Sequence, residues 1–368
     1  MPPIVIAAGG TGGHLFPAEA LAAALIARGR RVALLTDARS GAFAAAGFAG
    51  LETHTVQGSG IAGRGFLRGV SSLAALAMGT VQARGILARL NAAAVVGFGG
   101  YPSLPPLLAA RTLRRRPVTV LHEQNAVLGR ANRFLASRVD RLALSFAATL
   151  GVRDSERARA VHTGNPVRPA VARLAGRTPR TPDGRLRLLV LGGSLGARVF
   201  SDVVPSAIAA LSPGMRACID VVQQVRAEDA SRVEAAYAQA GVAATLSPFF
   251  TDIARHLAWA DLLVARAGGG QVAEAAACGL PALFVPLPSA IDDHQTANAR
   301  AAAEAGAAWV VPQPDFTQAC LAARLEDSLT TPTTLSRMAT AAAARGLPDA
   351  ADRLAELVLG LIPAEAYA

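Results

Sequence analysis

The same short pattern opens both halves of the sequence: an apolar run, a turn rich in glycine, and apolar residues at helical spacing. Residues 3–8 lead into a turn at 9–14, and residues 187–191 lead into a turn at 192–197. An apolar run of Val, Ile and Leu that ends at glycines indicates a buried strand, and the spacing after it indicates a helix. Two such starts predict an α/β chain of two similar Rossmann-like domains, each built on a parallel sheet.

Further apolar runs continue this alternation of strand and helix. Additional strands are predicted in the first half at 31–37, 93–98, 117–121 and 138–144. In the second half they are predicted at 219–223, 244–246 and 261–265, with 281–286 as the last. A glycine-rich loop is expected at 57–70, followed by a helix with Leu73, Leu76 and Val81 on one face.

A connector with two prolines, at 164–169, separates the two patterns. We therefore place the first domain at 1–165 and the second at 166–349. A last helix at about 350–368 carries Leu354, Leu357, Val358 and Leu361 on one face and can pack back onto the first domain. A chain of 368 residues with 52% hydrophobic residues is long enough for two cores.

The charge balance points to an anionic partner, because the formal net charge is +10. A nucleotide, a phosphosugar or an anionic membrane surface would fit. Aromatic residues make up only 5% of the chain, which disfavours stacking on single-stranded nucleic acid, and no groove-reading helix motif is present. We therefore expect no nucleic-acid partner.

The cysteine pattern and the hydropathy pattern predict a cytosolic chain. Cys218, Cys278 and Cys320 are widely spaced and form no CxxC pair, which argues against zinc sites and disulfides. No signal peptide precedes the first strand, and no uninterrupted apolar run is long enough to span a bilayer. Attachment to a membrane surface remains compatible with this pattern.

Polar residues gather where predicted strands end, and parallel strands bring such ends to one edge of a sheet. In the second domain, backbone N–H groups at 194–196 and 269–271 can hold phosphate oxygens, and Glu274 can accept hydrogen bonds from ribose hydroxyls. In the first domain, His14 and residues 99–101 and 122–125 suit a polyhydroxylated acceptor. Two such domains imply a cleft between facing strand ends, and a sugar transfer from a nucleotide fits both halves. No Asp-x-Asp motif is present, so we expect no metal or other cofactor, with helix N-termini and Arg168 compensating the phosphate charge.

Two other classes stay open from the residues alone. Asp37 stands where the ribose-binding acid of a nicotinamide-dependent oxidoreductase would stand, although Leu15 occupies the place of the third glycine of GxGxxG. We favour Asp37 as a strand-end cap. A binding protein for nucleotide sugars or polyanions, without catalysis, is the other alternative.

An ordered set of motifs covers nearly the whole chain. It comprises GGTGGH at 9–14 with FP at 16–17, GGY at 99–101, HEQN at 122–125, GNPVR at 164–168, GGS at 192–194, and HQ at 294–295 with Asn298. This set closely resembles the MurG family of bacterial glycosyltransferases, the UDP-N-acetylglucosamine–N-acetylmuramyl-(pentapeptide) pyrophosphoryl-undecaprenol N-acetylglucosamine transferases. The resemblance implies a two-domain GT-B fold. It also implies inverting transfer of N-acetylglucosamine from UDP-GlcNAc to the muramyl C4 hydroxyl of lipid I, giving lipid II. A related GT-B transferase with another lipid or small-molecule acceptor is the alternative.

The resemblance also implies a setting and a set of contacts. The setting is the cytoplasmic face of the inner membrane, as a peripheral protein in peptidoglycan synthesis, cell shape and cell division, with a cell-wall synthesis complex as a further partner. The implied donor contacts are Thr11, Gly12, Gly13, Asn125, Arg168, Ser194, Phe250, Gly269, Gly270, Gln271, Val272, Ala273, Glu274 and Gln295. The expected acceptor-side residues are Tyr101, His122, Gln124 and Asn132.

His14 is the predicted general base, because an imidazole titrates near neutral pH, and Glu123 is the competing candidate. The chain departs from the family at Leu195, where Gln is common, and at Gln271, which stands in place of the family's Thr and has no hydroxyl to contact phosphate. The pattern around 222–225 is also altered from a more usual His-Gln-x-Gly. Seven residues are predicted to seat the chain on anionic inner-leaflet lipid, with an ordinary solvated surface as the alternative: Arg64, Phe66, Leu67, Arg68, Arg114, Arg115 and Arg116.

Overall fold

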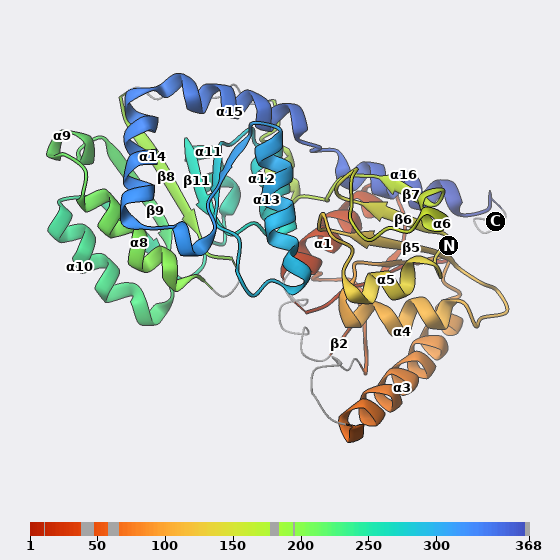
Figure 1. The fold of residues 1–368 in the computed structure, drawn as a ribbon. Helices are drawn as coiled ribbons and strands as arrows, with labels where there is room; N and C mark the ends of the chain where they lie inside the picture. The colour runs from red at the N-terminus through yellow and green to blue at the C-terminus, as the bar shows by residue number, and fades with distance from the viewer. Residues whose placement is uncertain (11, 38–47, 58–65, 177–183, 194–195, 365–368) are drawn as a thin grey trace. The chain divides into compact units, whose positions relative to one another are not determined.

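A computed structural model describes the chain except for residues 11, 38–47, 58–65, 177–183, 194–195 and 365–368, and except for the side chains of 66–72. It divides into two compact units (Figure 1). Unit 1 consists of Met1–Pro169 and Asp349–Ala368, and unit 2 consists of Ala170–Pro348. The two units are described separately below.

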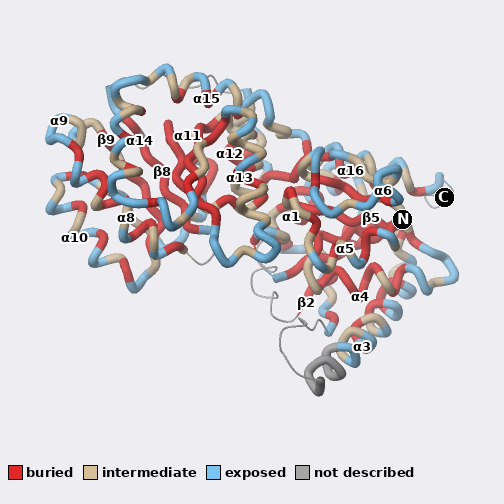
Figure 2. Tube along the Cα trace, viewed as in Figure 1, coloured by how far each residue is buried: buried red, intermediate tan, exposed pale blue. Residues whose placement is uncertain are grey.

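Unit 1 is built on a seven-stranded parallel sheet with the order β3-β2-β1-β4-β5-β6-β7. The strands are β1 (Ile4–Ala7), β2 (Val32–Asp37), β3 (Glu52–Val56), β4 (Ala94–Gly97), β5 (Val118–Glu123), β6 (Arg141–Leu144) and β7 (Ala160–His162). Every residue of β1, β2 and β4 is buried, as expected for central parallel strands that are covered on both faces. Figure 2 shows this burial along the trace.

Two hydrophobic clusters cover the two faces of this sheet. Successive residues of a strand point to opposite faces, so Ile4 and Ile6 belong to one cluster and Val5 to the other. The first cluster includes α1 (Gly12–Ala27) and α16 (Ala350–Leu361); the second includes α3 (Phe66–Leu90), α4 (Gly100–Ala110) and α5 (Arg130–Ala136). Leu354 and Val358 are fully buried in the first cluster, so the last helix is part of the unit 1 core. The short helices α6 (Asp154–Arg157) and α7 (Pro169–Ala172) follow β6 and β7.

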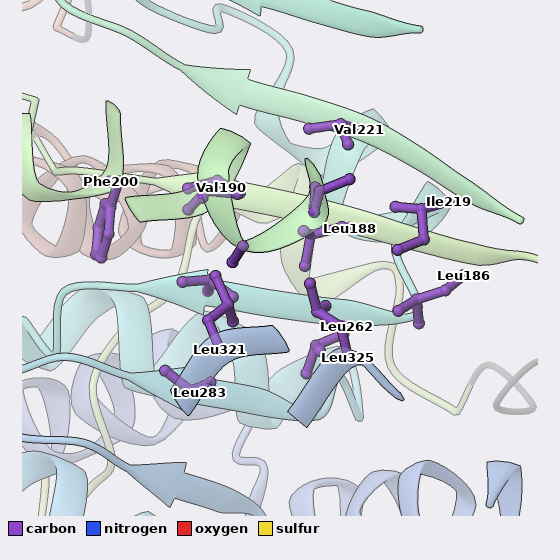
Figure 3. Close-up of a cluster of buried hydrophobic side chains, with 14 of the residues drawn as sticks. Leu186, Leu188, Val190, Phe200, Ile219, Val221, Leu262, Leu283, Leu321 and Leu325 are labelled. Atoms are coloured by element: carbon purple, nitrogen blue, oxygen red, sulfur yellow. The ribbon is translucent and has the colours of Figure 1, made fainter. Parts of the chain in front are cut away.

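Unit 2 contains a six-stranded parallel sheet with the order β10-β9-β8-β11-β12-β13. Its strands are β8 (Leu186–Leu191), β9 (Ile219–Gln224), β10 (Ala244–Ser247), β11 (Leu262–Ala265), β12 (Ala282–Phe284) and β13 (Ala308–Val310). Its helices are α8 (Arg198–Ala209), α9 (Pro213–Arg216), α10 (Ala230–Ala240), α11 (Ile253–Trp259), α12 (Gly269–Ala277), α13 (His294–Glu304), α14 (Gln318–Thr330) and α15 (Pro332–Arg345), with 3₁₀ turns η1 (Ala227–Asp229), η2 (Ile291–Asp293) and η3 (Gln313–Asp315). Figure 3 shows the core between strands and helices, in which Leu188 and Val190 of β8 and Leu321 and Leu325 of α14 belong to one hydrophobic cluster.

Three strands are absent from the sequence prediction. β3 has a mostly exposed, polar pattern, which gives no strand signal by hydrophobicity. β7 and β13 have only three residues each, too few for a period to be recognised. The prediction that 281–286 is the last strand is therefore wrong, because β13 pairs with β12 at the sheet edge.

The bounds and the buried face of helix α3 differ from the prediction. Residues 66–70 belong to this helix rather than to the predicted glycine-rich loop. Leu76 packs against the core, whereas the side chains of Leu73 and Val81 are 68% and 67% exposed, so these three residues do not share one face. The buried stripe instead includes Ala83 and Leu87, at helical spacing from Leu76.

Candidate functional site

The sheet of unit 1 reverses its order at β1, which has β2 on one side and β4 on the other. Open parallel sheets bind ligands at such a point, beyond the carboxyl ends of the strands. The turn after β1 leads into α1 and carries His14, and the turn after β4 leads into α4 at Gly100. A Cβ atom at Gly100 would lie 3.5 Å from His14 Cε1, and one at Gly10 would lie 3.8 Å from His14 Nδ1. The imidazole therefore lies at the switch point, between two glycine turns.

Arg168 lies beside the first turn of α1. Its guanidinium carbon is 4.6 Å from the centroid of the Phe16 ring, a cation–π contact. Gly12 leaves space for that ring, because a Cβ atom there would approach Phe16 to 2.7 Å. Burial raises the pKa of Glu19 on the same helix, and the charge of Arg168 partly offsets this. A helix N-terminus with an arginine beside it is a suitable place for an anionic group.

Glu123, the last residue of β5, holds the loop that follows it. Its Oε1 accepts from Asn125 N at 3.0 Å and from Asn125 Nδ2 at 3.1 Å, and its Oε2 accepts from Gly129 N and Asn132 Nδ2, both at 2.8 Å. The residue is 2% exposed. Burial raises the pKa of this carboxyl, and the four hydrogen bonds oppose that rise. Four donors occupy the carboxylate that the sequence offers as a second candidate base.

His122 and Gln124 form a second buried pair at the end of β5. His122 Nε2 lies 3.0 Å from Gly164 O, and Gln124 Nε2 lies 2.9 Å from His122 Nδ1, which assigns the proton to Nε2. Burial, with a smaller contribution from the charge of His14, lowers the pKa of His122 to about 4, although the hydrogen bond to Gly164 O opposes this shift. His122 is fully buried and Gln124 is 3% exposed. Both side chains are thus engaged inside the protein, so any influence on an acceptor passes through the segments they hold.

The other two expected acceptor-side residues are also partly or wholly enclosed. Asn132 is 2% exposed and lies against Gly99, where a Cβ atom would be 3.0 Å from both of its amide atoms. Gly99 has a φ of +81°, so the turn needs glycine for two reasons. Tyr101 packs in part against the core cluster beneath α4. Of the predicted HEQN residues, only Asn125 is less than fully buried.

In unit 2, a tight glycine turn follows β8. A Cβ atom on Gly192 would lie 2.4 Å from Ala197 N, and Gly193 has a φ of +84°. Both positions therefore need glycine, and the turn leads directly to the N-terminus of α8.

The second glycine turn of unit 2 leads into α12. Gly268 is the residue before the first helical turn, and Glu274 lies on this helix, 5% exposed. Gln271 Nε2 is buried and has no hydrogen-bond partner in the described part of the chain. The predicted donor contacts on this helix are thus together at one N-terminus: Gly269, Gly270, Gln271, Val272, Ala273 and Glu274.

Side chains of helix α13 connect this second turn to the segment that follows β12. Gln295 Oε1 accepts from Ala267 N at 3.2 Å and from Leu287 N at 3.0 Å, and Asn298 Nδ2 donates to Ala267 O at 2.9 Å. Gln295 Nε2 has no hydrogen-bond partner within the described residues. This amide nitrogen is the part of Gln295 that is left to donate a hydrogen bond.

Arg266 is a residue that the sequence analysis passed over. It directly follows β11, and its guanidinium donates to Val285 O at 3.1 Å, Pro286 O at 3.2 Å and Gln313 Oε1 at 2.6 Å. Burial lowers the pKa of Arg266 from its usual value. An arginine at the end of an otherwise apolar strand is the feature of the sequence that could have identified this residue. Through these hydrogen bonds Arg266 connects the end of β11 to the end of β12, beside the α12 turn.

The remaining predicted residues complete the placement. The Phe250 ring lies 4.4 Å from the His256 ring, between centroids, and is half-buried. Thr11, Ser194 and Arg64 are outside the described residues. Among those that are described, no group of three or more His, Cys, Asp and Glu side chains could hold a metal ion.

Comparison with known proteins identifies the family. The model of the glycosyltransferase family 28 N-terminal domain matches residues 4–144, and that of the C-terminal domain matches 187–354. The chain belongs to glycosyltransferase family 28. It is similar to a protein of Granulibacter bethesdensis, 55% identical over 97% of this chain and 93% of that one, and to one of Acidiphilium cryptum, 53% identical over 98% and 97%. Both are named UDP-N-acetylglucosamine–N-acetylmuramyl-(pentapeptide) pyrophosphoryl-undecaprenol N-acetylglucosamine transferase.

The crystal structure of Acinetobacter baumannii MurG is also similar, with a TM-score of 0.79, 30% identity and coverage of 98% of this chain and 100% of that one. The glycosyltransferase of kitacinnamycin, at 17% identity and a TM-score of 0.65, shows likeness of fold alone. The predicted α/β fold class, with two Rossmann-like domains of the GT-B type, is confirmed. This family 28 chain is a glycosyltransferase.

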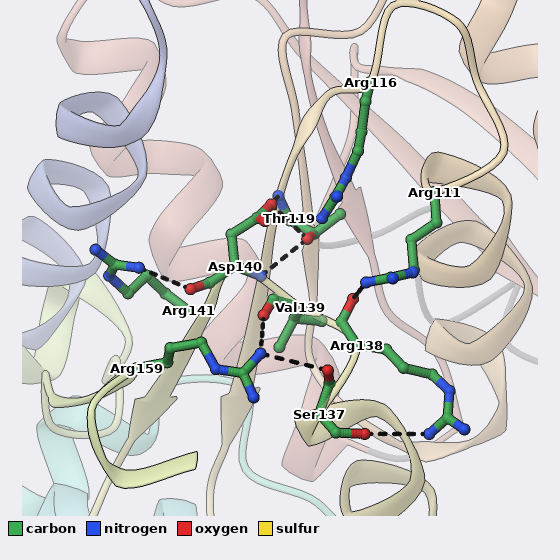
Figure 4. Close-up of polar contacts among 9 residues, drawn as sticks. All are labelled: Arg111, Arg116, Thr119, Ser137, Arg138, Val139, Asp140, Arg141 and Arg159. Carbon is green, nitrogen blue, oxygen red and sulfur yellow. Dashed lines mark hydrogen bonds and ion pairs between the residues drawn. The ribbon is translucent and has the colours of Figure 1, made fainter. Parts of the chain in front are cut away.

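Three of the predicted lipid-facing arginines of this glycosyltransferase lie at the amino ends of the strands of unit 1, away from the carboxyl ends described above. Arg114, Arg115 and Arg116 are exposed and precede β5, so they are at the amino end of the strand that Glu123 terminates. Arg116 pairs with Asp140 at 2.7 Å, within a group of arginines of which Arg111, Arg141 and Arg159 donate to backbone carbonyls and Arg138 donates to Ser137 Oγ (Figure 4). Phe66, Leu67 and Arg68 belong to the first turn of α3. Among the helices of the described chain, none is both long and apolar enough to cross a membrane.

Proposed function

We propose that this glycosyltransferase moves N-acetylglucosamine from UDP-GlcNAc to the C4 hydroxyl of the muramyl sugar of lipid I, giving lipid II for peptidoglycan synthesis. The observation that carries the proposal is identity of 49–55% over nearly the full length to several proteins named for this transfer. The geometry agrees with it, because unit 1 offers an imidazole and unit 2 offers glycine turns at helix N-termini.

In the proposed reaction, His14 is the general base. The acceptor C4 oxygen forms a bond to C1 of the donor sugar while the bond from C1 to the β-phosphate oxygen breaks, with inversion. The hydroxyl proton passes to His14, and UDP leaves with the bonding electron pair. His14 Nδ1 is buried against the glycine turns, so Nε2 is the nitrogen that accepts the proton. The four donors on Glu123 favour a positioning role for that carboxylate over a role as base.

Donor binding is assigned chiefly to unit 2. Glu274 accepts from the ribose hydroxyls, the N-terminus of α12 and the turn containing Ser194 bind the diphosphate, and Phe250 borders uracil through its backbone. Gln295 donates to a sugar hydroxyl through Nε2, since its Oε1 is already used by two backbone amides. From unit 1, Arg168 adds positive charge, and four further residues contact the donor: Thr11, Gly12, Gly13 and Asn125.

Acceptor binding is assigned to unit 1. Tyr101 is the acceptor-side residue of the α4 turn, and His122, Gln124 and Asn132 act by fixing the segments around it. Their buried hydrogen bonds support this positioning role.

Docking on anionic lipid at the cytoplasmic face of the inner membrane is part of the proposal. Helix α3 exposes Leu73, Met78 and Val81, with side chains 68%, 52% and 67% exposed. Val81 lies three positions after Met78 and eight after Leu73, so it shares a side of the helix with each of them, and the exposed Arg114 and Arg115 add positive charge on the same unit. Substituting Leu73 and Val81 together by Ser, or Arg114 and Arg115 by Glu, should reduce co-sedimentation with anionic vesicles. Unchanged binding by both variants would contradict docking through this surface.

Roles in cell shape and division follow from the supply of lipid II, and a cell-wall synthesis complex is the further partner that the proposal includes.

A transfer assay tests the main proposal. Radiolabelled UDP-GlcNAc and lipid I are incubated with the full chain, and lipid II is separated by chromatography. We expect transfer that depends on lipid I and that unlabelled UDP-GlcNAc competes for, while UDP-glucose competes poorly. Transfer only to another lipid would support a related transferase instead. Binding of UDP-GlcNAc without any transfer would leave a binding protein.

A further inference from the structure

Two neighbouring glutamines end strand β9, and their side chains do different things. Gln223 is fully buried and its Oε1 accepts from the Tyr237 hydroxyl at 2.6 Å, which fastens β9 to α10. Gln224 is 7% exposed, and its hydrogen bonds go to backbone atoms. Successive residues of a strand point to opposite faces, so the two amides serve different surroundings.

The amide of Gln224 bonds to backbone on both sides of β9. Its Oε1 accepts from Gly192 N at 3.1 Å, and its Nε2 donates to Gly193 O at 3.0 Å and to Pro248 O at 3.1 Å. Gly192 and Gly193 belong to the turn after β8, and Pro248 follows β10. Both hydrogens of Nε2 and the oxygen are thereby engaged.

These bonds join two segments with different proposed tasks toward the donor. The turn after β8 leads to a helix N-terminus and is assigned the diphosphate, and Phe250, two residues past Pro248, is assigned the uracil. We propose that Gln224 is a positioning residue for UDP-GlcNAc, which sets the phosphate-binding turn in register with the segment that borders the base. This inference rests on the proposed donor site in unit 2.

The chemistry of this position favours a neutral amide. A carboxylate of the same length could accept from Gly192 N, but it would face Gly193 O and Pro248 O without a proton to donate. It would also place a negative charge beside a turn that is to hold a diphosphate. A leucine would fill the space and leave one amide and two carbonyls without this partner.

The experiment compares Gln224→Leu with the matched control Gln223→Leu, which removes the neighbouring buried amide from the opposite face of the same strand. UDP affinity is measured by calorimetry, the KM of UDP-GlcNAc and of lipid I and kcat by the transfer assay, and thermal stability by circular dichroism. We expect Gln224→Leu to weaken UDP binding and raise the KM of UDP-GlcNAc by about tenfold, with kcat and the KM of lipid I changed less than twofold. Gln223→Leu should lower the melting temperature and leave UDP affinity unchanged.

A conservative variant gives a second readout. Gln224→Glu can donate one hydrogen bond only when its carboxyl is protonated, so its UDP affinity relative to wild type should recover as the pH is lowered. Wild-type UDP affinity in Gln224→Leu would overturn the inference, as would equal weakening by Gln223→Leu. Failure of the wild-type chain to bind UDP would instead overturn the proposed donor site itself.

Discussion

The two units hold their loops at the carboxyl ends of their strands with different chemistry. In unit 1 the central groups are titratable: the buried carboxylate of Glu123 and the buried imidazole of His122. In unit 2 the corresponding turns are held by the neutral amides of Gln224, Gln295 and Asn298. The cationic guanidinium of Arg266 assists them. Both edges are otherwise built alike, from parallel strands that end in glycine turns.

This difference agrees with the charge of the substrate group that each unit is proposed to bind. A carboxylate that clamped a phosphate-binding turn would repel the diphosphate, so amides and a guanidinium are the suitable clamps in unit 2. The buried Glu274 on α12 is assigned the ribose instead. Unit 1 is proposed to receive a proton from a neutral hydroxyl, and there a carboxylate held by four donors adds rigidity without meeting a phosphate. Substitutions in unit 1 should therefore act on kcat and on pH dependence, and those in unit 2 on donor affinity.

The largest expected effect is at His14. His14→Ala should lower kcat by about 10²–10⁴-fold, the range of a lost general base, with the KM of UDP-GlcNAc changed less than threefold. Steady-state transfer assays over pH 5.5–9 measure both constants. The acid limb of the kcat profile should disappear in the variant. A rise in donor KM larger than the fall in kcat would break the proposed division between the units.

The next effect is on the stability of unit 1. Glu123→Ala removes the acceptor of four hydrogen bonds and leaves buried donors unpaired, so we expect a loss of about 4 kcal/mol. The two tryptophans, Trp259 and Trp309, both belong to unit 2. Circular dichroism should thus report an earlier transition while tryptophan fluorescence reports an unchanged one. Equal shifts by both probes would show that the units unfold together.

A pH dependence of unit 1 is the third expectation. The pKa of His122 is about 4 when folded against 6.5 otherwise, so the unfolded chain binds more protons between these values. Stability therefore falls as the pH is lowered, by about 2 kcal/mol between pH 7.5 and 5 from this residue. The raised pKa of Glu123 acts in the opposite sense, because its contribution is lost as the pH rises.

His122→Gln isolates the histidine in that measurement. Thermal melts of both chains by circular dichroism between pH 5 and 7.5 should differ in slope, and the variant should be flatter. Equal slopes would show that His122 is not kept neutral by burial.

The sequence predicts the fold class and most central strands because buried parallel strands are nearly continuous apolar runs. It misses β3, whose residues are polar, and β13, which has three residues. It groups residues 122–125 at one strand end, but the bonding that encloses His122 depends on Gly164, far along the chain. The positioning role of Gln224 could not be predicted for the same reason, because its three partners lie on turns that only the folded sheet brings together.

The smallest expected effect tests why unit 2 uses amides. Asn298 is fully buried and donates to Ala267 O at 2.9 Å, in the segment before the α12 turn. Asn298→Leu leaves that carbonyl unpaired, and we expect the KM of UDP-GlcNAc to rise about threefold with kcat unchanged. Asn298→Asp keeps the shape but adds a charge that faces the carbonyl, so its donor KM should be higher than that of Asn298→Leu at pH 8 and should fall on acidification. The opposite outcome is that the aspartate variant binds the donor as well as the leucine variant at every pH. Repulsion of the diphosphate would then not explain why amides hold these turns. The contrast between the two units would be one of packing alone.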